Sequence, residues 1–345
     1  MGTRKGAEIR LKSRPTGMPD PANFDLVTVD VPDPGPGQIL VRNSYMTVDP
    51  YMRGRMMDRR SYVPPFQIGE SLTGGAVGQV VAAGPGAHFQ VGDHVLSMAG
   101  WREWFVASGP ELMVQKIEQI PGVGIQSYLG ALGMPGLTAY VGLLKIGELK
   151  DGERVFVSAA SGAVGAIVCQ IAKAKGCYVV GSAGSDEKCA HLKEDLGVDK
   201  IINYKTCGDL NAAVAAAFPE GIDVYFDNVG GSHLEAAIGN MRQFGRLAEC
   251  GMIEQYNATE PPPGPRNLIM VVGLSLTMRG FIVSNHFDMM PDFMRDMATW
   301  IKAGKMTWRE TIADGLAKAP EAFIGLFKGE NFGKMLVRVG PDKAV

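Results

Sequence analysis

Cysteine and histidine are scarce in this sequence, and their spacing excludes the usual metal-binding motifs. All five cysteines lie at or beyond Cys169, no two form a C-x-x-C pair, and none of the five histidines forms H-x-x-x-H or H-E-x-x-H. A disulfide framework or a four-cysteine zinc site needs cysteines paired at short spacing. We therefore expect neither a disulfide nor a metal site.

The sequence also lacks an excess of charge and a long apolar run. Its 345 residues carry 34 Lys and Arg against 36 Asp and Glu, which gives no electrostatic basis for binding nucleic acid or a membrane surface. The longest uncharged apolar run, 268–278, is shorter than the roughly 18 residues that a bilayer requires. The opening residues, MGTRKGAEIRLKSRP, lack the apolar segment of a secretory signal. These absences predict a cytoplasmic protein.

Glycine is abundant, and its positions divide the sequence into two parts. In the first part, short β-branched runs at 39–42, 77–82 and 94–98 are separated by Gly- and Pro-rich turns, which is typical of an antiparallel, barrel-like domain. From about residue 129, six apolar runs alternate with amphipathic segments at 162–175, 186–196, 209–217 and 232–241. That alternation predicts an α/β fold with a doubly wound parallel sheet.

The tail of the sequence is expected to rejoin the first part. After a predicted helix at 292–303, the segment FIGLFKGENFGKMLVRV returns to strand-like composition. We therefore predict a first domain of residues 1–128 completed by 305–345, and a second domain of residues 129–304.

A glycine-rich turn joins the first predicted strand of the second part to its first helix. The segment AASGAVG (159–165) is an A-x-x-G-x-x-G form of the dinucleotide fingerprint. Gly162 allows a pyrophosphate to approach the backbone, and Gly165 allows the helix to pack closely against the strand. The start of the helix then presents free N–H groups to the phosphates. A strand before the turn and a helix after it favour a dinucleotide site over a simple turn.

The end of the second predicted strand distinguishes the two nicotinamide dinucleotides. An NAD site places an acidic residue there, about 20 residues after the fingerprint, but that position is occupied by Ser182. Asp186 and Glu187 come later, where they fit the first turn of a helix. Lys188 follows and can reach a 2′-phosphate. NADP(H) is therefore the predicted cofactor.

Several longer segments resemble one protein family over nearly the whole sequence. They are VDPYMRGRM (48–56), LGMPGLTAYVGLL (132–144), DVYFDNVGG, GMIEQYNAT and GLFKGENFGKMLVRV. Together they resemble the zinc-independent medium-chain dehydrogenases/reductases, in the branch of prostaglandin, plant alkenal and, most closely, bacterial curcumin reductases. The resemblance implies a GroES-like catalytic domain, a Rossmann NADPH-binding domain and a homodimer.

The resemblance also implies roles for residues at matching positions. Gly162, Ala163, Val164 and Gly165 would line the pyrophosphate, while Lys188 and Tyr204 would hold the 2′-phosphate. A further group would approach the nicotinamide half of the cofactor: Asn228, the loop from Cys250 through Gly251 and Met252 to Tyr256, the segment Phe281, Ile282 and Val283, and Asn331.

The reaction follows from what the first part lacks. It has no cysteine, and Glu70 has no histidine beside it, so nothing obvious would polarise the carbonyl of an alcohol–ketone substrate through a metal. Reduction of a carbon–carbon double bond conjugated to a carbonyl needs only a neutral donor to stabilise the enolate. Tyr51, Tyr62 and Tyr256 lie in segments that the resemblance places around the substrate. The basic run Arg53, Arg55, Arg59 and Arg60 is interpreted as mostly solvated.

Two other functions fit the same sequence. A quinone reductase on this scaffold would depend little on Tyr256, and an NADPH-binding protein without turnover would need no donor. We expect a small-molecule enone or enal as the substrate of the favoured function.

Overall fold

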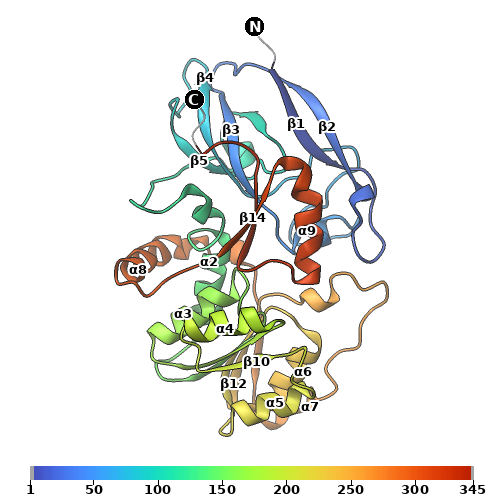
Figure 1. The fold of residues 1–345 in the computed structure, drawn as a ribbon, viewed down its shortest axis with the longest axis vertical. Coiled ribbons are helices and arrows are strands. Elements are labelled where there is room, and N and C mark those ends of the chain that lie inside the picture. The colour runs from blue at the N-terminus through green and yellow to red at the C-terminus, as the bar shows by residue number, and fades with distance from the viewer. Residues whose placement is uncertain (1–3, 343–345) are drawn as a thin grey trace. The chain divides into compact units, whose positions relative to one another are not determined.

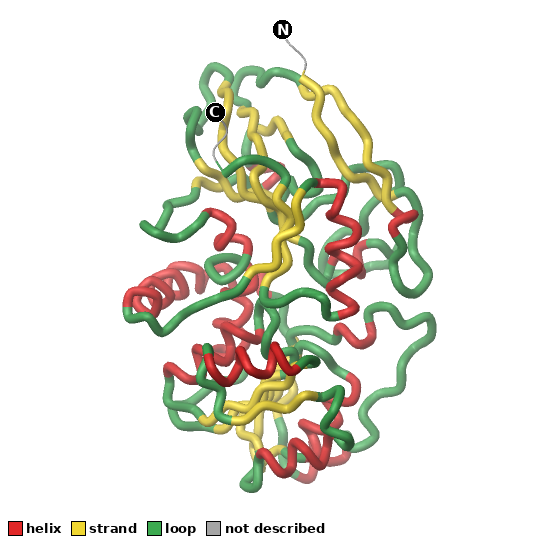
Figure 2. The backbone as a smooth tube through the Cα atoms, viewed as in Figure 1, coloured by secondary structure: helices red, strands yellow, loops and turns green. Residues whose placement is uncertain are grey.

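The computed structural model describes residues 4–342 and separates them into two compact units. The first unit contains residues 4–129, 310–331 and 335–342, and the second contains residues 130–309 and 332–334. Each unit contains a sheet of its own, shown in Figure 1 as a ribbon and in Figure 2 by secondary structure.

The strands fall into two sets, of which the first belongs to the first unit. In that unit they are β1 (Arg4–Leu11), β2 (Phe24–Val31), β3 (Ile39–Thr47), β4 (Ala76–Ala83), β5 (His94–Ser97), β6 (Trp104–Ala107), β7 (Gln115–Lys116), β14 (Glu310–Asp314) and β15 (Lys334–Arg338). In the second unit they are β8 (Arg154–Val157), β9 (Tyr178–Ala183), β10 (Lys200–Asn203), β11 (Ile222–Asp227), β12 (Met241–Glu249) and β13 (Thr277–Gly280).

Helices are concentrated in the second unit. The α-helices are α1 (Met52–Arg55), α2 (Met134–Tyr140), α3 (Gly165–Ala174), α4 (Asp186–Glu194), α5 (Leu210–Ala217), α6 (Gly231–Gly239), α7 (Ile269–Gly273), α8 (Met290–Lys302) and α9 (Ala319–Lys328). Shorter helical segments are η1 (Pro21–Asn23), η2 (Pro110–Leu112), η3 (Ile125–Leu129), η4 (Val141–Ile146), η5 (Ile253–Gln255), η6 (Val283–Met289) and η7 (Leu316–Lys318).

The first unit is built on an antiparallel sheet, as the sequence predicts. Its strand order is β14-β15-β3-β4-β5-β7, β6 also pairs with β3, and β1 and β2 form a separate two-stranded ribbon. Phe24 stacks on Trp101 at 5.8 Å between ring centroids, and Phe323 meets Trp101 edge-on at 6.2 Å. These buried rings join the ribbon and helix α9 in one core cluster.

Two expectations for the first unit were wrong. The strand-like tail begins as helix α9, because Pro320 starts the helix and Gly329 ends it in a left-handed conformation. Phe323 and Phe327, one helical turn apart, then meet edge-on at 5.2 Å between ring centroids. Strand structure returns only at β15, which pairs with β3.

The arginines of the basic run are not all solvated. Arg53 and Arg55 are buried, with 2% and 9% of their surface exposed. Arg53 donates a hydrogen bond to the Gly17 carbonyl, and Arg55 donates to the Pro64 carbonyl while its guanidinium lies over the Phe66 ring. Short helix α1 turns these two side chains inward, where backbone carbonyls replace water as their partners.

The second unit is a doubly wound parallel sheet, and this prediction is confirmed. Its strand order is β10-β9-β8-β11-β12-β13, so the order reverses between β8 and β11. Figure 1 shows α3 and α4 on one side of this sheet and α5, α6 and α7 on the other. In such sheets, ligands bind at the carboxyl ends of the strands beside the reversal point, which here are the residues that follow β8 and β11.

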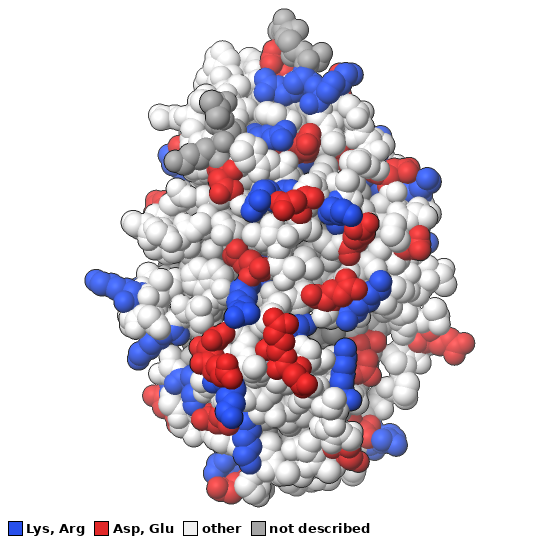
Figure 3. All heavy atoms as spheres, in the orientation of Figure 1, with Lys and Arg blue, Asp and Glu red and all other residues white. Residues whose placement is uncertain are grey.

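One face of the molecule shows no concentration of one charge. On the face drawn in Figure 3, acidic and basic side chains are interspersed. Among residues 4–342, no helix has both the length and the apolar character needed to cross a membrane.

Candidate cofactor-binding site

Residues 158–164 form the turn between β8 and α3, which we call the fingerprint turn. Ala159 adopts a left-handed conformation with φ of 47°. A Cβ atom on Gly165 would lie 2.4 Å from the Ala159 carbonyl oxygen, so only glycine lets the helix start against this turn. A Cβ on Gly162 would meet only that same oxygen, at 3.2 Å. Gly162 therefore keeps open the space in front of the backbone rather than relieving a clash.

The start of α3 is electrically suited to an anion. No side chain caps the helix, and its first turn contains no acidic residue. The first N–H bonded within the helix is that of Ala166, which donates to the Gly162 carbonyl at 3.0 Å. The N–H groups just before it have no acceptor within the helix, as at any helix start. An uncapped start carries partial positive charge and N–H donors that suit phosphate.

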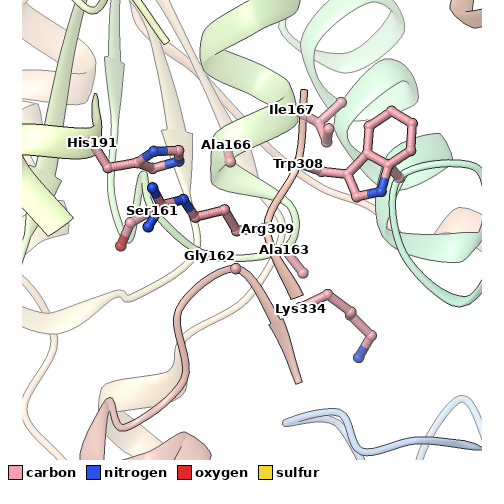
Figure 4. Close-up of a pocket in the computed structure, with 11 residues that line it drawn as sticks. Ser161, Gly162, Ala163, Ala166, Ile167, His191, Trp308, Arg309 and Lys334 are labelled. Carbon is pink, nitrogen blue, oxygen red and sulfur yellow. The ribbon is translucent and has the colours of Figure 1, made fainter. Parts of the chain in front are cut away.

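A small pocket lies against the fingerprint turn, and a cation lines it. Figure 4 shows the Arg309 guanidinium beside Ser161 and His191. Arg309 lies over the Phe332 ring at 4.7 Å and pairs with Asp195 at 3.3 Å. Gly333 donates its N–H to the Ser161 carbonyl at 3.1 Å. The returning segment 332–334 is thus hydrogen-bonded to the turn within the second unit.

The end of β9 is neutral or basic, as the sequence predicts. The Ser182 hydroxyl is buried, and no residue within 4–342 forms a hydrogen bond with it. Lys188 lies in the first turn of α4, behind the cap formed by Ser185. Burial lowers the pKa of Lys188, and the charge of nearby Lys205 lowers it further. Two lysines therefore place positive charge next to this strand end, and Glu187 in the same turn of α4 opposes it in part.

Tyr204 lies over the same strand end. A Cβ on Gly184 would be 2.5 Å from the Tyr204 hydroxyl oxygen, so the ring covers the backbone after β9. The other side of the Tyr204 ring meets the His233 ring edge-on at 5.2 Å between centroids. Tyr204 remains 40% exposed, so its hydroxyl is available to a ligand.

Asn228 lies at the reversal point, where hydrogen bonds to Ser158, the residue after β8, hold it in place. Its side-chain amide donates to the Ser158 carbonyl at 2.8 Å, and its backbone N–H donates to the Ser158 hydroxyl at 2.8 Å. Ser158 in turn donates its hydroxyl proton to Asp227 at 3.0 Å. These bonds lock together the ends of the two strands that flank the reversal point.

The loops after β11 and β12 are bonded to each other. Cys250 and Gly251 donate their N–H groups to the Asp227 carbonyl at 2.9 and 3.0 Å, and Ile253 donates to the Asn228 carbonyl at 3.3 Å. Gly230 and Gly231 have φ of 74° and 49°, and a Cβ on Gly230 would lie 2.9 Å from Met252. The two glycines are therefore required by the neighbouring loop.

The Tyr256 hydroxyl points back at its own loop. It accepts the Met252 N–H at 3.4 Å, and a Cβ on Gly251 would lie 3.0 Å from it. Burial raises the pKa of Tyr256, so the hydroxyl is protonated at neutral pH. Within residues 4–342 it donates to no acceptor, which leaves its proton available to a ligand.

The segment 281–283 follows β13 directly. Phe281 donates its N–H to the Glu249 carbonyl at 3.4 Å and packs its ring against Phe226 at 6.4 Å between centroids. Ile282 and Val283 are half-buried, Ile282 just before η6 and Val283 as its first residue. These residues therefore lie at the carboxyl edge of the sheet, beyond the strand itself.

The remaining predicted residues belong to the first unit. Tyr51 precedes α1, and the charges of Arg55 and Tyr62 both act on its hydroxyl, whose pKa is raised chiefly by burial. Tyr62 is 59% exposed. Asn331 lies in the turn between α9 and β15. The structure thus brings Tyr51 and Tyr62 together around Arg55.

Sequence reasoning missed several residues of this edge, and two of them left a signal. Lys205 directly follows Tyr204, so the basic pair could have been read from the segment NYK. Asp227 directly precedes Asn228. Arg309 and His233 left none, because they reach the site only through the packing of distant segments.

Comparisons with known proteins cover both units. Residues 7–115 match the family described as "N-terminal domain of oxidoreductase", and residues 163–300 match "Zinc-binding dehydrogenase". The chain is 46% identical to the NADPH-dependent curcumin reductase of Escherichia coli, over 99% of this chain and 100% of that protein. It belongs to the medium-chain dehydrogenase/reductase family, in the branch of the curcumin, alkenal and prostaglandin reductases.

A second relative and a solved structure support the same family assignment. The chain is 44% identical to the NADP-dependent 2-alkenal reductase of Nicotiana tabacum, over 97% of this chain and 98% of that protein. The crystal structure of CurA from Vibrio vulnificus in complex with NADPH superposes with a TM-score of 0.91 at 41% identity, covering 97% of this chain and 99% of that one. Despite the name of the second family, the described residues contain no group of three or more His, Cys, Asp or Glu able to hold a metal ion.

Proposed function

We propose that this protein is an NADPH-dependent reductase of carbon–carbon double bonds conjugated to a ketone or aldehyde. The observation that carries the proposal is the fingerprint turn followed by a strand end with lysines in place of an acid, in a chain 46% identical to a curcumin reductase. The cofactor is NADP(H), and it supplies a hydride for the β-carbon of the substrate when bound.

The residues at the edge of the sheet fit this cofactor in two groups. We call the fingerprint turn, the start of α3 and the residues around Lys188 and Tyr204 the phosphate half. Ala163, Val164 and Gly165 would hold the pyrophosphate through backbone N–H groups, and Gly162, whose own N–H donates to the Ala159 carbonyl, would leave room for it. Lys188, Tyr204 and Lys205 would hold the 2′-phosphate.

We call the loops 227–231 and 250–256 with the segment 281–283 the nicotinamide half. Asn228, Cys250, Gly251 and Met252 would contact the nicotinamide and its ribose, with Phe281, Ile282 and Val283 packing against the ring. The role of Asn331 stays what the family resemblance implies. The dense hydrogen bonding of these loops supports a fixed position for this end of the cofactor.

The chemical step requires a donor for the enolate oxygen. Tyr256 would provide it, because its hydroxyl is neutral, already accepts the Met252 N–H and still has its own proton to donate. Tyr51 and Tyr62 would bind the body of the substrate from the first unit, which would serve as the catalytic domain while the second unit binds NADPH. A protonated tyrosine stabilises developing negative charge without a metal.

The test is a set of turnover assays that follow oxidation of NADPH and of NADH with an enone, with a quinone and without an acceptor. We expect rapid NADPH oxidation with the enone and little with NADH. Turnover with the quinone alone would favour a quinone reductase, and cofactor binding without any turnover would contradict the proposed activity.

A homodimer through the edge of the parallel sheet is also proposed. Strand β13 ends the sheet, and all of its residues are exposed. Beside it in the sequence, Ile269 and Val272 are 74% and 77% exposed. An unpaired edge next to exposed apolar side chains is typical of a subunit interface. Sedimentation of the protein should show a dimer, and Val272→Asp should shift it toward monomer.

A further inference from the structure

Two carboxyl groups are buried side by side beneath the nicotinamide half. Asp227 ends β11 and Glu249 ends β12, and the two are direct partners in the parallel register. Asp227 is fully buried. No N–H or O–H donor within residues 4–342 reaches Asp227 Oδ2 or either carboxyl oxygen of Glu249. The hydrogen bond left to them is the one between the two side chains, and it requires a proton on one of them.

The other oxygen of Asp227 shows which group holds that proton. Asp227 Oδ1 accepts from the Ser158 hydroxyl at 3.0 Å, the Tyr225 hydroxyl at 2.7 Å, and the N–H groups of Val229 and Gly230 at 2.8 and 2.9 Å. Four donors on one oxygen stabilise a carboxylate and disfavour a carboxylic acid. The proton therefore belongs to Glu249.

Asp227 also connects three strand ends. Its side chain holds Ser158 after β8 and the backbone of the turn at 229–230, while its carbonyl accepts the N–H groups of Cys250 and Gly251 after β12. Movement of this side chain would release Ser158 and the turn at 229–230, whereas the loop after β12 is held by the backbone carbonyl of the same residue.

We propose that Glu249 is a protonated carboxylic acid that donates to the Asp227 carboxylate, and that this pair positions loops 227–231 and 250–256 for the reaction. The positioning role rests on the proposed function, whereas the shared proton is a property of the free protein. Neither side chain is a catalytic residue, because each acts through the loops that it holds.

The pKa shifts of the ionisable groups around the pair leave a single negative charge in the cluster at neutral pH. Burial and the neighbouring Asp227 charge raise the pKa of Glu249 to about 9. Burial also raises the pKa of the Tyr225 hydroxyl and raises that of the Cys250 thiol to about 12, and it lowers the pKa of His233 to about 4. With Tyr256 also protonated, Asp227 is the charged member of this cluster at neutral pH.

The shared proton has a defined effect on stability. Glu249 titrates near about 4.3 in an unfolded chain and at about 9 in the fold. Its contribution to stability is therefore complete below the unfolded value and is lost as pH rises toward the folded value. Between about pH 6.5 and 8.5, His233 and Cys250 also titrate in the unfolded chain. They do so in the parent and in Glu249→Gln alike, so the difference between these two proteins isolates Glu249.

The first experiment measures urea unfolding of the cofactor-free protein across that window. Glu249→Gln keeps a donor toward Asp227 at every pH, so its stability should not carry this dependence. We expect the unfolding constant of the parent to rise relative to that of Glu249→Gln by up to about tenfold per pH unit. Glu194→Gln, a change at an exposed position in α4, is the matched control and should follow the parent.

Infrared spectroscopy of the same proteins at neutral pH provides a second readout. The parent and Glu194→Gln should show the carbonyl stretch of a buried protonated carboxyl, and Glu249→Gln should lack it. Equal pH slopes for the parent and Glu249→Gln, or an identical infrared band in both, would overturn the shared proton.

The second experiment addresses positioning. Asp227→Asn keeps an oxygen for the four donors but turns an amide toward Glu249, which then ionises. We expect kcat to fall about tenfold or more through misplacement of the loops, with a smaller change in NADPH affinity. In combination with Glu249→Gln the losses should be non-additive. Parental kcat in Asp227→Asn would overturn the positioning role. A parent that reduces no enone would refute the proposed function while leaving the first experiment intact.

Discussion

The phosphate half and the nicotinamide half lie along the same edge of one sheet, yet their backbones are satisfied in opposite ways. At the fingerprint turn, glycines keep space open and the start of α3 has no side-chain cap. At loops 227–231 and 250–256, backbone N–H groups are bonded to carbonyls and to a buried carboxylate. In the phosphate half, the backbone N–H groups at the start of α3 are left for the ligand. In the nicotinamide half, the backbone N–H groups bond to the protein itself and make the loops rigid.

This difference predicts a separation of kinetic effects. Changes in the phosphate half should weaken cofactor binding and leave the chemical step largely intact. Changes in the nicotinamide half should lower kcat with little effect on NADPH affinity. Each prediction below tests one side of that separation.

The largest effect is expected from Gly165→Ala. Its Cβ would lie 2.4 Å from the Ala159 carbonyl oxygen, so α3 must shift away from the turn. We expect a loss of about 1–3 kcal/mol in the free energy of unfolding, measured with urea, and about 100-fold weaker NADPH binding as several phosphate contacts are lost. Gly162→Ala is the matched comparison and should leave stability nearly unchanged. Equal destabilisation by both would contradict the distinction between the two glycines.

Lys188→Ala should affect the cofactor selectively. Loss of a charge-assisted contact worth roughly 1.5–3 kcal/mol should weaken NADPH binding about 10- to 150-fold, while NADH binding barely changes. Fluorescence titration with each cofactor measures this. Lys193→Ala, on the exposed side of the same helix, should have no effect. Similar losses for NADPH and NADH would remove Lys188 from the 2′-phosphate site.

Tyr256→Phe tests the nicotinamide half. Removing one donor to a developing oxyanion commonly lowers kcat by about 10²–10³. We expect roughly 3- to 100-fold here, because a hydroxyl of the nicotinamide ribose can share the task. NADPH affinity should hardly change, and quinone reduction should suffer less than enone reduction. An enone rate equal to that of the parent would show that the Tyr256 hydroxyl is not the donor and that the residue contributes only its ring to the pocket.

The smallest effect is expected from metal removal. The described residues offer no group of metal ligands, and the proposed donor is a tyrosine. Dialysis against a strong chelator should leave the enone reductase rate unchanged. A rate that falls on dialysis and returns with added zinc would contradict this prediction and would assign the metal a role in the chemical step.

Local patterns in the sequence predicted the parallel sheet and the phosphate half. Alternating strands and helices, a glycine turn between them and the lack of an acid after β9 are all features of neighbouring residues. Tyr204, Asn228 and Tyr256 were reached through resemblance to a family, and their roles stay predictions.

The same patterns misled where long-range packing dominates. The apolar residues of α9 have strand-like composition, but the core cluster that contains Trp101 accepts them as a helical face. Arg53 and Arg55 look like surface residues in a basic run, but carbonyls of distant loops solvate them. The ribbon of β1 and β2 was not predicted, because its pairing joins segments across a long connection.

By itself, the sequence determined the glycine turn between β8 and α3 and so predicted where the cofactor's phosphates approach, because glycine spacing and the residue after a strand act locally on the backbone. Only the tertiary structure decided that Asp227 and Glu249 meet. Their contact depends on the register of two parallel strands separated by a helix. That register is set by packing of the whole sheet, and a carboxyl pair buried by it has no signature among its sequence neighbours.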